Sequence, residues 1–465
     1  MDNAEGSVVK GHSRTRSAAK AARPLSVARG PLDVDDIPPL GSQAQAQAQT
    51  PPHSHPPRTP RPTTPLGRES PVPYSPGGRS PRPAPPPIDL SHLLRPDVYH
   101  ALPTQHIPAP FRTSPAQPPI ATPLPTLLAQ GHYRLAAAAA ARALTSGAVA
   151  PSDAPAVYDL LYTRLACLTL LGPAGTAMAA QEARALGDAD LGRGQKKAGA
   201  DDQGVAAAAA AAVPWALRLL HVRLQALGFG DPRRAVMSYF EMARECRARI
   251  AAAAAAAAAR RAKEGAGAEE AEEAETVWRE RLADLGLRVA GVLIEMEDLE
   301  GAACHLASLR EGDGGDGGGR LALARALLWL HLGDVEAARG CVQPGQRGDR
   351  VVAALCDMAD GEYGAALEKW RHVQAAAAAG GDSEMAGVNL AVCLLYVGKM
   401  QEGKAQLEKL VDEGYASHTL LFNLSTMYEL CSDQAKTLKL RLAERVAGMA
   451  PTPSGWEKTN ADFKL

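Results

Sequence analysis

The chain has 465 residues and a formal net charge of −1 at pH 7, which argues against a nucleic-acid or membrane-surface protein that acts through bulk charge. Hydrophobic residues make up 46% of the sequence but aromatic residues only 4%. The core must therefore be built from alanine, leucine and valine, which favours helices over strands. Of the 36 prolines, 28 precede residue 126, so a proline-rich N-terminal part is followed by a nearly proline-free remainder.

Residues 1–87 have the composition of a disordered arm. They contain 11 Lys and Arg against 6 Asp and Glu, a net charge of +5, and almost no large apolar residues. Such a segment cannot offset the entropy lost on ordering by burying apolar surface. Several Ser-Pro and Thr-Pro steps are candidate sites of proline-directed phosphorylation, although ordinary linker composition explains them equally well. They are Thr59, Thr64, Ser70, Ser75 and Ser80.

Residues 88–123 carry many apolar side chains among prolines that forbid a long helix. This combination predicts an extended strap that lies in a groove, and a slightly apolar linker is the simpler alternative. The apolar residues are Ile88, Leu90, Leu93, Leu94, Val98, Tyr99, Leu102, Ile107 and Phe111.

Residues 124–450 are predicted to form tetratricopeptide-like helix pairs, with residues 451–465 as a C-terminal tail. Turn residues recur at positions 131, 172, 230, 297, 333, 361, 398 and 432, and all are glycine except Glu297 and Ser432, with the weaker copies at Gly172, Gly230, Glu297 and Ser432. The last four intervals, 36, 28, 37 and 34 residues, are close to the roughly 34-residue period of tetratricopeptide repeats. The expected fold is therefore all-α, a tetratricopeptide-type α-solenoid preceded by the long disordered arm.

Each position of the repeat has a physical reason. A glycine ends the first helix and lets the chain turn tightly. An alanine five residues later lies where the two helices of a pair cross, so a bulky side chain there would force them apart. The residues assigned to the pattern are Gly131, Tyr133 and Ala136; Gly333 and Ala338; Gly361, Tyr363, Ala366 and Trp370; and Gly398.

Low-complexity insertions interrupt the repeats near 188–212, 251–275 and 312–319. The alanine run 251–259 is expected to extend the helix before it, because alanine has the highest helix propensity. The basic and then acidic residues that follow it are expected to be solvated, without a buried face. The glycine-rich 312–319 lacks a following Lys-Ser/Thr, so it is read as a flexible loop and not as a phosphate-binding loop.

No sequence feature indicates an enzyme, a cofactor or a metal site. The motifs H-E-x-x-H and G-x-S-x-G are absent. Seven cysteines occur singly among apolar residues, without C-x-x-C spacing, and are read as buried free thiols in a reducing compartment. A polar N-terminus and the lack of a long apolar run predict neither a signal peptide nor a membrane span, which places the chain in the cytosol or nucleus.

The inner face of the repeats is a candidate peptide-binding surface. Asn389 and Asn423 are 34 residues apart, at the same position of successive first helices, and with Tyr428 they are the candidate partner contacts. A purely structural role is favoured, because asparagine is common at this position. A clamp for a peptide C-terminus would also need inward Lys and Arg. The positions where these would stand hold Val352, Met385 and Thr419.

Two parts of the sequence resemble the subunit 12 family of the transport protein particle (TRAPP) complex. They are NLAVCLLYVGKMQEGKAQLEKLV at 389–411 with LLFNLSTMYELCSD at 420–433, and LRPDVYHALP at 94–103. The resemblance implies a tetratricopeptide scaffold of a vesicle-tethering complex in ER-to-Golgi and Golgi transport. It further implies contact with other TRAPP subunits and support, without catalysis, of Rab-type GTPase activation. The implied location is cytoplasmic, peripheral to Golgi and ER-exit membranes through the partners.

The leading hypothesis is therefore a non-catalytic scaffold subunit with no cofactor, no nucleic-acid partner and no direct membrane insertion. A tetratricopeptide adaptor or co-chaperone that binds short peptides is the alternative, and an enzyme with a helical accessory domain is a third possibility. The missing carboxylate clamp favours the scaffold over the co-chaperone. The alanine and glycine insertions depart from the family pattern, and the resemblance supplies no individual functional residues.

Overall fold

In the computed structural model, the described residues are 89–104, 107–187, 213–261, 268–310, 317–345, 348–377, 383–453 and 455–458. The arm at 1–87 and the insertion at 188–212 lie outside them. So do most of the glycine-rich insertion and the end of the tail after residue 458. The expectations for these segments remain predictions, but the last three glycines of the loop expected at 312–319 begin a helix, Gly317–Leu332, so the expected loop was wrong there.

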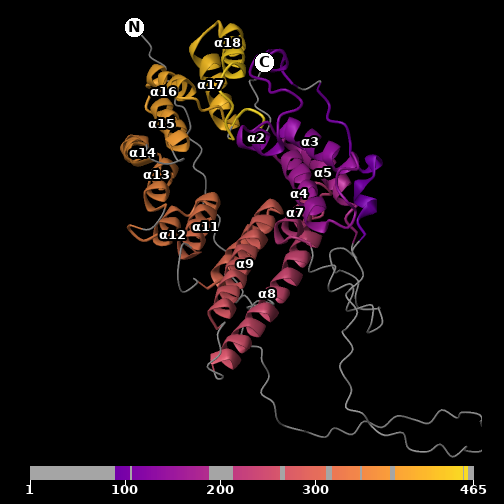
Figure 1. Cartoon of the computed structure of the whole chain (residues 1–465). Coiled ribbons are helices and arrows are strands. Elements are labelled where there is room, and N and C mark those ends of the chain that lie inside the picture. Colours follow the sequence, from indigo (N-terminus) through magenta and orange to yellow (C-terminus); the bar gives the residue numbers. More distant parts are fainter. Residues whose placement is uncertain are drawn as a thin grey trace, which may run out of the picture. The chain divides into compact units, whose positions relative to one another are not determined.

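The described chain consists of helices, turns and connecting segments without strands, which confirms the all-α helical-repeat fold (Figure 1). Two short 3-10 helices, η1 (Ser91–Leu94) and η2 (Pro96–Val98), and the helix α1 (Ala109–Arg112) precede the repeats. The repeats are the pairs α2 (Leu124–Ala129) and α3 (Tyr133–Thr145); α4 (Ala154–Leu170) and α5 (Pro173–Ala183); α7 (Trp215–Leu227) and α8 (Pro232–Arg261); α9 (Ala268–Glu295) and α10 (Leu299–Ser308); α11 (Gly317–Leu332) and α12 (Val335–Gly340); α13 (Asp349–Ala359) and α14 (Tyr363–Ala377); α15 (Ser383–Tyr396) and α16 (Met400–Asp412); and α17 (His418–Cys431) and α18 (Ala435–Ala447).

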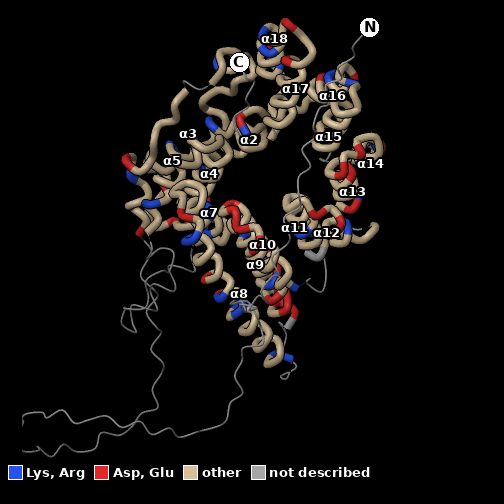
Figure 2. The backbone as a smooth tube through the Cα atoms, turned by 180° about the vertical axis from the view of Figure 1, so that it is seen from behind, with Lys and Arg blue, Asp and Glu red and all other residues tan. Residues whose placement is uncertain are grey.

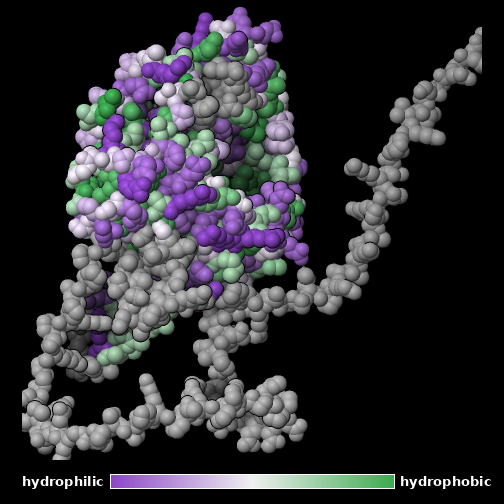
Figure 3. All heavy atoms as spheres, turned by 90° about the vertical axis from the view of Figure 1, so that its right-hand side faces the viewer, coloured by the Kyte–Doolittle hydropathy of each residue, from purple (hydrophilic) through white to green (hydrophobic). Residues whose placement is uncertain are grey.

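Each repeat helix packs against the next one along the described chain, and first helices of neighbouring pairs also touch, as α15 touches α17. This is the packing of a repeat protein, in which neighbours cover each other's apolar stripes. Charged residues of both signs are spread over the helices (Figure 2). Hydrophilic and hydrophobic residues alternate in small groups over the face shown in Figure 3. Among the described residues, no helix is both long enough and apolar enough to cross a membrane.

Most pairs turn through one hydrogen-bonded motif. The amide of Gly361 donates to the carbonyl three residues back at 3.2 Å, and the next amide donates to the carbonyl five residues back at 2.8 Å. The same two bonds form at Gly131, Gly333 and Gly398. The motif requires a left-handed residue, and φ at these four glycines lies between +73° and +86°. Ser432, in the last turn, instead has φ −154°, which is extended backbone.

Glu297 occupies the left-handed turn position between α9 and α10. Its φ is +61°, and it is the only residue other than glycine with a positive φ in the described part of the chain. It makes both hydrogen bonds of the motif, at 2.9 and 3.0 Å. A side chain in this conformation costs about 1 kcal/mol or more, because Cβ crowds the following carbonyl oxygen. The repeat therefore imposes its turn geometry on a residue that disfavours it.

Small residues stand five positions after the turn in most pairs. Ala136, Ala338 and Ala366 are fully buried there. Ala235 in α8 and Ala302 in α10 hold the equivalent positions and are also fully buried. Sequence reasoning did not name these last two, although counting five residues from turn positions 230 and 297 would have found them. The close crossing is thus common to at least five pairs.

In the pair α15–α16 the residue at the helix crossing is even smaller than alanine. Its crossing residue is Gly403, where an added Cβ would lie 3.0 Å from the carbonyl oxygen of Ala391 and 3.1 Å from the Met427 side chain. A methyl group here would therefore be tighter than ordinary van der Waals contact and would require its neighbours to move. The sequence repeat and the packing thus agree on where the backbones approach most closely.

The insertion at 251–275 lengthens one helical hairpin. As expected, the alanine run continues α8, which reaches 30 residues. The acidic residues begin α9, which packs along α8. Ala257 of the alanine run is buried, and so is Ala271 within the charged stretch, so the expectation that this stretch lacks a buried face was wrong at Ala271. Alanines spaced along both helices let two otherwise polar helices approach closely enough to exclude water.

The strap differs from the extended segment that the sequence predicts. It forms η1, η2 and α1, separated by prolines that end each short helical turn. Leu90 and Leu93 are buried in the hydrophobic cluster of α3 and α4. Phe111 belongs to the cluster formed by α16, α17 and α18. The strap thus contributes to the cores of both the first and the last repeats.

The cysteines are free thiols of differing exposure, and those that the structure buries are held protonated. Burial raises the pKa of Cys167 to about 12 and the pKa of Cys246 and Cys393 to about 11. Cys356 is also buried. Cys304 is exposed, so the expectation that every cysteine is buried was wrong; Cys341 and Cys431 are half-buried.

We expect Ala366→Leu to destabilise the fold by about 1–3 kcal/mol, because extra methylene groups at a fully buried helix crossing overpack it. The free energy of unfolding in urea measures the effect. Ala365→Leu is the matched control, since Ala365 is exposed on the same helix. Equal stability of the two variants would contradict the assigned crossing.

Glu297→Gly should stabilise the chain by up to about 1 kcal/mol, because glycine adopts the left-handed conformation without steric strain. The reverse change is Gly361→Ala. An added Cβ at Gly361 would meet no atom within 4 Å, so only the backbone strain of the left-handed conformation acts there. That change should destabilise by about 1 kcal/mol. Urea unfolding of both variants tests this pair, and a loss of stability in Glu297→Gly would show that the glutamate side chain itself stabilises the turn.

Candidate partner-binding surface

A buried ion pair fixes the strap to the first repeats. Arg164 of α4 and Glu182 of α5 are each 1% exposed. Nε and Nη2 of Arg164 donate to the two carboxylate oxygens of Glu182 at 2.9 and 2.7 Å. The same guanidinium donates to the carbonyl oxygens of Ala137 and His100, and the His100 amide donates back to Glu182 at 2.9 Å. Strap, α3, α4 and α5 therefore meet in one network.

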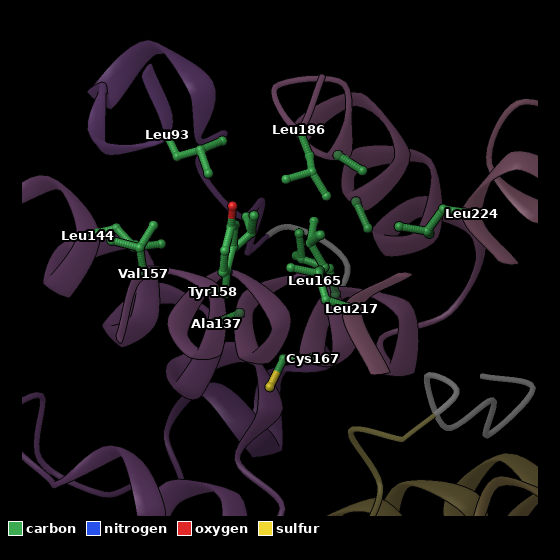
Figure 4. Packing of buried hydrophobic residues seen from close by; sticks show 14 of the residues in the cluster. Leu93, Ala137, Leu144, Val157, Tyr158, Leu165, Cys167, Leu186, Leu217 and Leu224 are labelled. Atoms are coloured by element: carbon green, nitrogen blue, oxygen red, sulfur yellow. The ribbon is translucent and has the colours of Figure 1, made fainter. Parts of the chain in front are cut away.

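This network uses the backbone of the LRPDVYHALP segment at 94–103. Tyr99 is half-buried and donates its hydroxyl hydrogen to the carbonyl of Leu93 at 2.5 Å. Burial raises the pKa of Tyr99, so the phenol stays neutral. Figure 4 shows Leu93 facing Tyr158 and Val157, on the side of the cluster opposite Leu224. The segment is therefore engaged in internal packing.

The C-terminal tail completes the first repeat. The Glu457 carboxylate accepts the backbone N–H of Arg134 at 2.8 Å and lies 4.0 Å from Nδ1 of His132. Tyr133 donates its hydroxyl hydrogen to the carbonyl of Pro453 at 2.6 Å. His132 stands at the start of α3 without a side-chain capping bond. Glu457, itself buried, supplies the missing acceptor for this helix terminus.

The tail also reaches the strap. The rings of Trp456 and Phe111 lie 4.0 Å apart, and the hydroxyl of Ser114 donates to the carbonyl of Ala447. Trp456 therefore packs on Phe111 and not on Leu440 of α18, which is 42% exposed.

Gly131 has a second role that the other turn glycines lack. A Cβ at this position would lie 2.2 Å from the carbonyl oxygen of Thr452 in the tail. At Gly333, Gly361 and Gly398 an added Cβ would meet no atom within 4 Å. Gly131 is therefore needed both for its left-handed turn and for the close approach of the tail.

The first helices α15 and α17 present apolar side chains to solvent on equivalent positions. We call these residues the α15–α17 face. Tyr396 is 62% exposed and Leu430 is 55% exposed, each seven residues after the asparagine of its helix. Tyr396 stacks on Tyr363 of α14 with the ring centroids 4.2 Å apart. The face consists of Met385, Asn389, Tyr396, Phe422, Asn423 and Leu430.

The two asparagines are half-buried and bonded alike. Nδ2 of Asn389 donates to the carbonyl of Met385 at 2.9 Å, and Nδ2 of Asn423 donates to the carbonyl of Thr419 at 2.8 Å. Each side-chain amide thus donates one N–H to its own helix and retains a second N–H and an oxygen for other contacts. The side-chain amides of Asn389 and Asn423 are therefore held in one orientation by hydrogen bonds to their own helices.

Tyr428 does not belong to this face. It is 5% exposed, and its hydroxyl donates to Glu408 at 3.1 Å. The expectation that Tyr428 contacts a partner was wrong, because its ring fills the core between α16, α17 and α18. Tyr428 therefore lies on the buried side of α17. Val352, at one position of the absent carboxylate clamp, is likewise buried.

No protein-family model matches the chain. Human trafficking protein particle complex subunit 12 is 27% identical to it over 257 residues, which is 51% of this chain and 34% of the human protein. The mouse protein of the same name is 26% identical over 251 residues, 50% of this chain and 31% of its own length. The chain spans about a third of the length of these curated relatives. The family resemblance drawn from the sequence motifs is confirmed.

Glu182→Gln should lower the free energy of unfolding by about 3 kcal/mol or more, because it leaves the buried Arg164 guanidinium charged and without its counter-charge. The strap should at the same time become sensitive to limited proteolysis near residue 100. Glu295→Gln is the control, since the Arg223–Glu295 pair is much more exposed and should contribute less than about 1 kcal/mol. Equal effects of the two changes would contradict the anchoring role of the buried pair.

Proposed function

We propose that the chain is a non-catalytic scaffold subunit of a TRAPP-type vesicle-tethering complex. The observation that carries the proposal is its similarity to subunit 12 of the human and mouse trafficking protein particle complexes. The helical-repeat fold supports it, because stacked helix pairs offer long surfaces for other proteins. The polar groups of the strap network make internal contacts, which is a structural role.

The α15–α17 face is the surface that we assign to partner contact. Its exposed Tyr396 and Leu430 are apolar side chains that gain by burial against another protein. Tyrosine is also among the residues that most often anchor protein interfaces. Asn389 and Asn423 lie seven residues before them on the same two helices and can add directional hydrogen bonds.

In this role the chain contacts other TRAPP subunits and supports the activation of a Rab-type GTPase by the assembled complex. It acts in ER-to-Golgi and Golgi vesicle transport. Its place is cytoplasmic, at Golgi and ER-exit membranes that it reaches through its partners.

A tetratricopeptide adaptor that binds short peptides is the second candidate. The paired asparagines on equivalent positions of α15 and α17 favour it. A carboxylate-clamp co-chaperone is disfavoured, because Val352 is buried and Met385 and Thr419 carry no charge. An adaptor of this kind would bind peptides without the other TRAPP subunits.

Affinity purification of the tagged full chain from its own cells should recover other TRAPP subunits. We expect the double change Tyr396→Ser and Leu430→Ser to abolish that recovery, because it removes the apolar anchors of the face. Met237→Ser is the matched control, since Met237 is an apolar side chain of similar exposure, 56%, on α8.

Recovery of chaperones or isolated peptides without TRAPP subunits would contradict the scaffold and support the adaptor. Recovery that survives the double change would instead contradict only the assigned face. Size-exclusion chromatography and the urea midpoint of each variant establish that the fold is intact. The function and the surface are thereby tested separately.

A further inference from the structure

Two of the five tryptophans meet at the junction of α7 and α9. Trp215 and Trp278 lie edge to face, with ring centroids 5.6 Å apart and planes at 87°. The guanidinium of Arg281 lies 4.4 Å from the Trp278 ring centroid and 5.0 Å from that of Trp215. One cation is thus held between two indoles, and all three residues are half-buried.

Two further arginines surround this pair of indoles. Arg218 lies 5.4 Å from the Trp215 centroid and Arg249 lies 5.7 Å from the Trp278 centroid. Glu245 accepts from Arg218 at 3.3 Å and lies 4.0 Å from Arg249. We call these six residues the arginine–tryptophan cluster. They are Trp215, Arg218, Glu245, Arg249, Trp278 and Arg281.

The cluster carries more positive than negative charge. Three guanidinium groups share one carboxylate, which leaves a surplus of two positive charges. In the described part of the chain, no carboxylate lies within ion-pair distance of Arg281. Like charges at a half-buried site repel each other more strongly than they would in water. An anion that enters the cluster would relieve this repulsion, so the arrangement favours an anionic ligand.

We propose that the cluster binds the phosphorylated Ser-Pro segment of the chain's own N-terminal arm, residues 71–84, which contains Ser75 and Ser80. Arginine forks match the geometry of a phosphate and bind it through paired, charge-assisted hydrogen bonds. Proline-rich segments dock in grooves lined by aromatic side chains, and the two half-buried indoles are such side chains. The sequence PVPYSPGGRSPRPA joins both chemistries in one stretch.

Phosphorylation supplies the charge complementarity that the arm otherwise lacks. The segment 71–84 contains Arg79 and Arg82 and no acidic residue, so without phosphate it carries +2 and is repelled by the cluster. A proline-directed kinase transfers the γ-phosphoryl group of ATP to the serine hydroxyl oxygen and releases ADP and the hydroxyl proton. Each phosphoserine then brings about −1.5 to −2 charges at pH 7. Two of them turn a repelled segment into an attracted one.

The segment is long enough to reach the cluster. The strap starts beside the beginning of α4, where the Leu90 amide donates to Pro151 at 3.0 Å, and α7 packs against α4. The 17 residues of α4 span about 25 Å. Ser80 and Ser75 precede Asp89 by 9 and 14 residues, which extend to about 30 and 46 Å.

The test uses the full chain and a fluorescent peptide of residues 71–84, with phosphate on both serines or on neither. Fluorescence anisotropy gives the dissociation constant. We expect the phosphopeptide to bind at least about tenfold more tightly than the unmodified peptide, because the phosphates form charge-assisted hydrogen bonds with arginine. Equal binding of the two peptides would overturn the proposal.

Arg281→Gln should weaken phosphopeptide binding about tenfold, because it removes a charged donor. Arg249→Gln is a second variant with little risk to folding, since its side chain is 54% exposed. Arg279→Gln is the control: it lies on the same helix, is 65% exposed and pairs with Glu275 at 2.5 Å. Circular dichroism verifies the fold. An unchanged dissociation constant in both Arg281→Gln and Arg249→Gln would contradict the site. An equal loss of affinity in Arg279→Gln would contradict it as well.

The occupant is tested with a chain that carries phosphoserine at 75 and 80. Its own arm should fill the cluster, so added phosphopeptide should bind at least about tenfold more weakly than to the unmodified chain. Undiminished binding would reject the arm as occupant and point to a phosphorylated partner instead. Displacement of the peptide by an equal concentration of inorganic phosphate would reduce the cluster to a simple anion site and overturn the proposal.

Discussion

Every helix pair of this chain leaves an apolar stripe that only a neighbour can cover, and the structure is organised around meeting that requirement. Inside the array the next pair supplies the cover. At the first pairs Leu90 and Leu93 of the strap add to it, and at the last pairs Phe111 does. The strap and tail are thus working parts of the core, joined by the contact of Phe111 with Trp456.

The sequence predicts what is local and periodic. Turn glycines and crossing alanines are readable because geometry at those positions tolerates few residues, and even Glu297 falls in register. The strap network could not be predicted from the sequence. Arg164 binds the carboxylate of Glu182, 18 residues later in the chain, and the carbonyl of His100, 64 residues earlier, and no local pattern marks these partners. The partner role expected for Tyr428 was also wrong, because the sequence alone does not show which face of α17 the neighbouring helices bury.

The candidate surface shows the same division. The equivalence of Asn389 and Asn423 follows from their 34-residue spacing, but the exposure of Tyr396 and Leu430 depends on how the neighbouring helices pack. The arginine–tryptophan cluster escaped sequence reasoning because its members come from three helices. The sequence has only five tryptophans, so each of them was worth considering as a candidate contact residue, and two of them do meet in this cluster.

The capping of α3 by Glu457 has a consequence for synthesis on the ribosome. The donor amide and its acceptor are 323 residues apart, and at about 5–20 residues per second the acceptor emerges roughly 16–65 s after the helix that needs it. Pro453, which receives the Tyr133 hydroxyl, arrives with it. The first pair to be made is therefore among the last to be finished, and until residue 457 appears its helix terminus and apolar edge stay open to chaperones or to other chains.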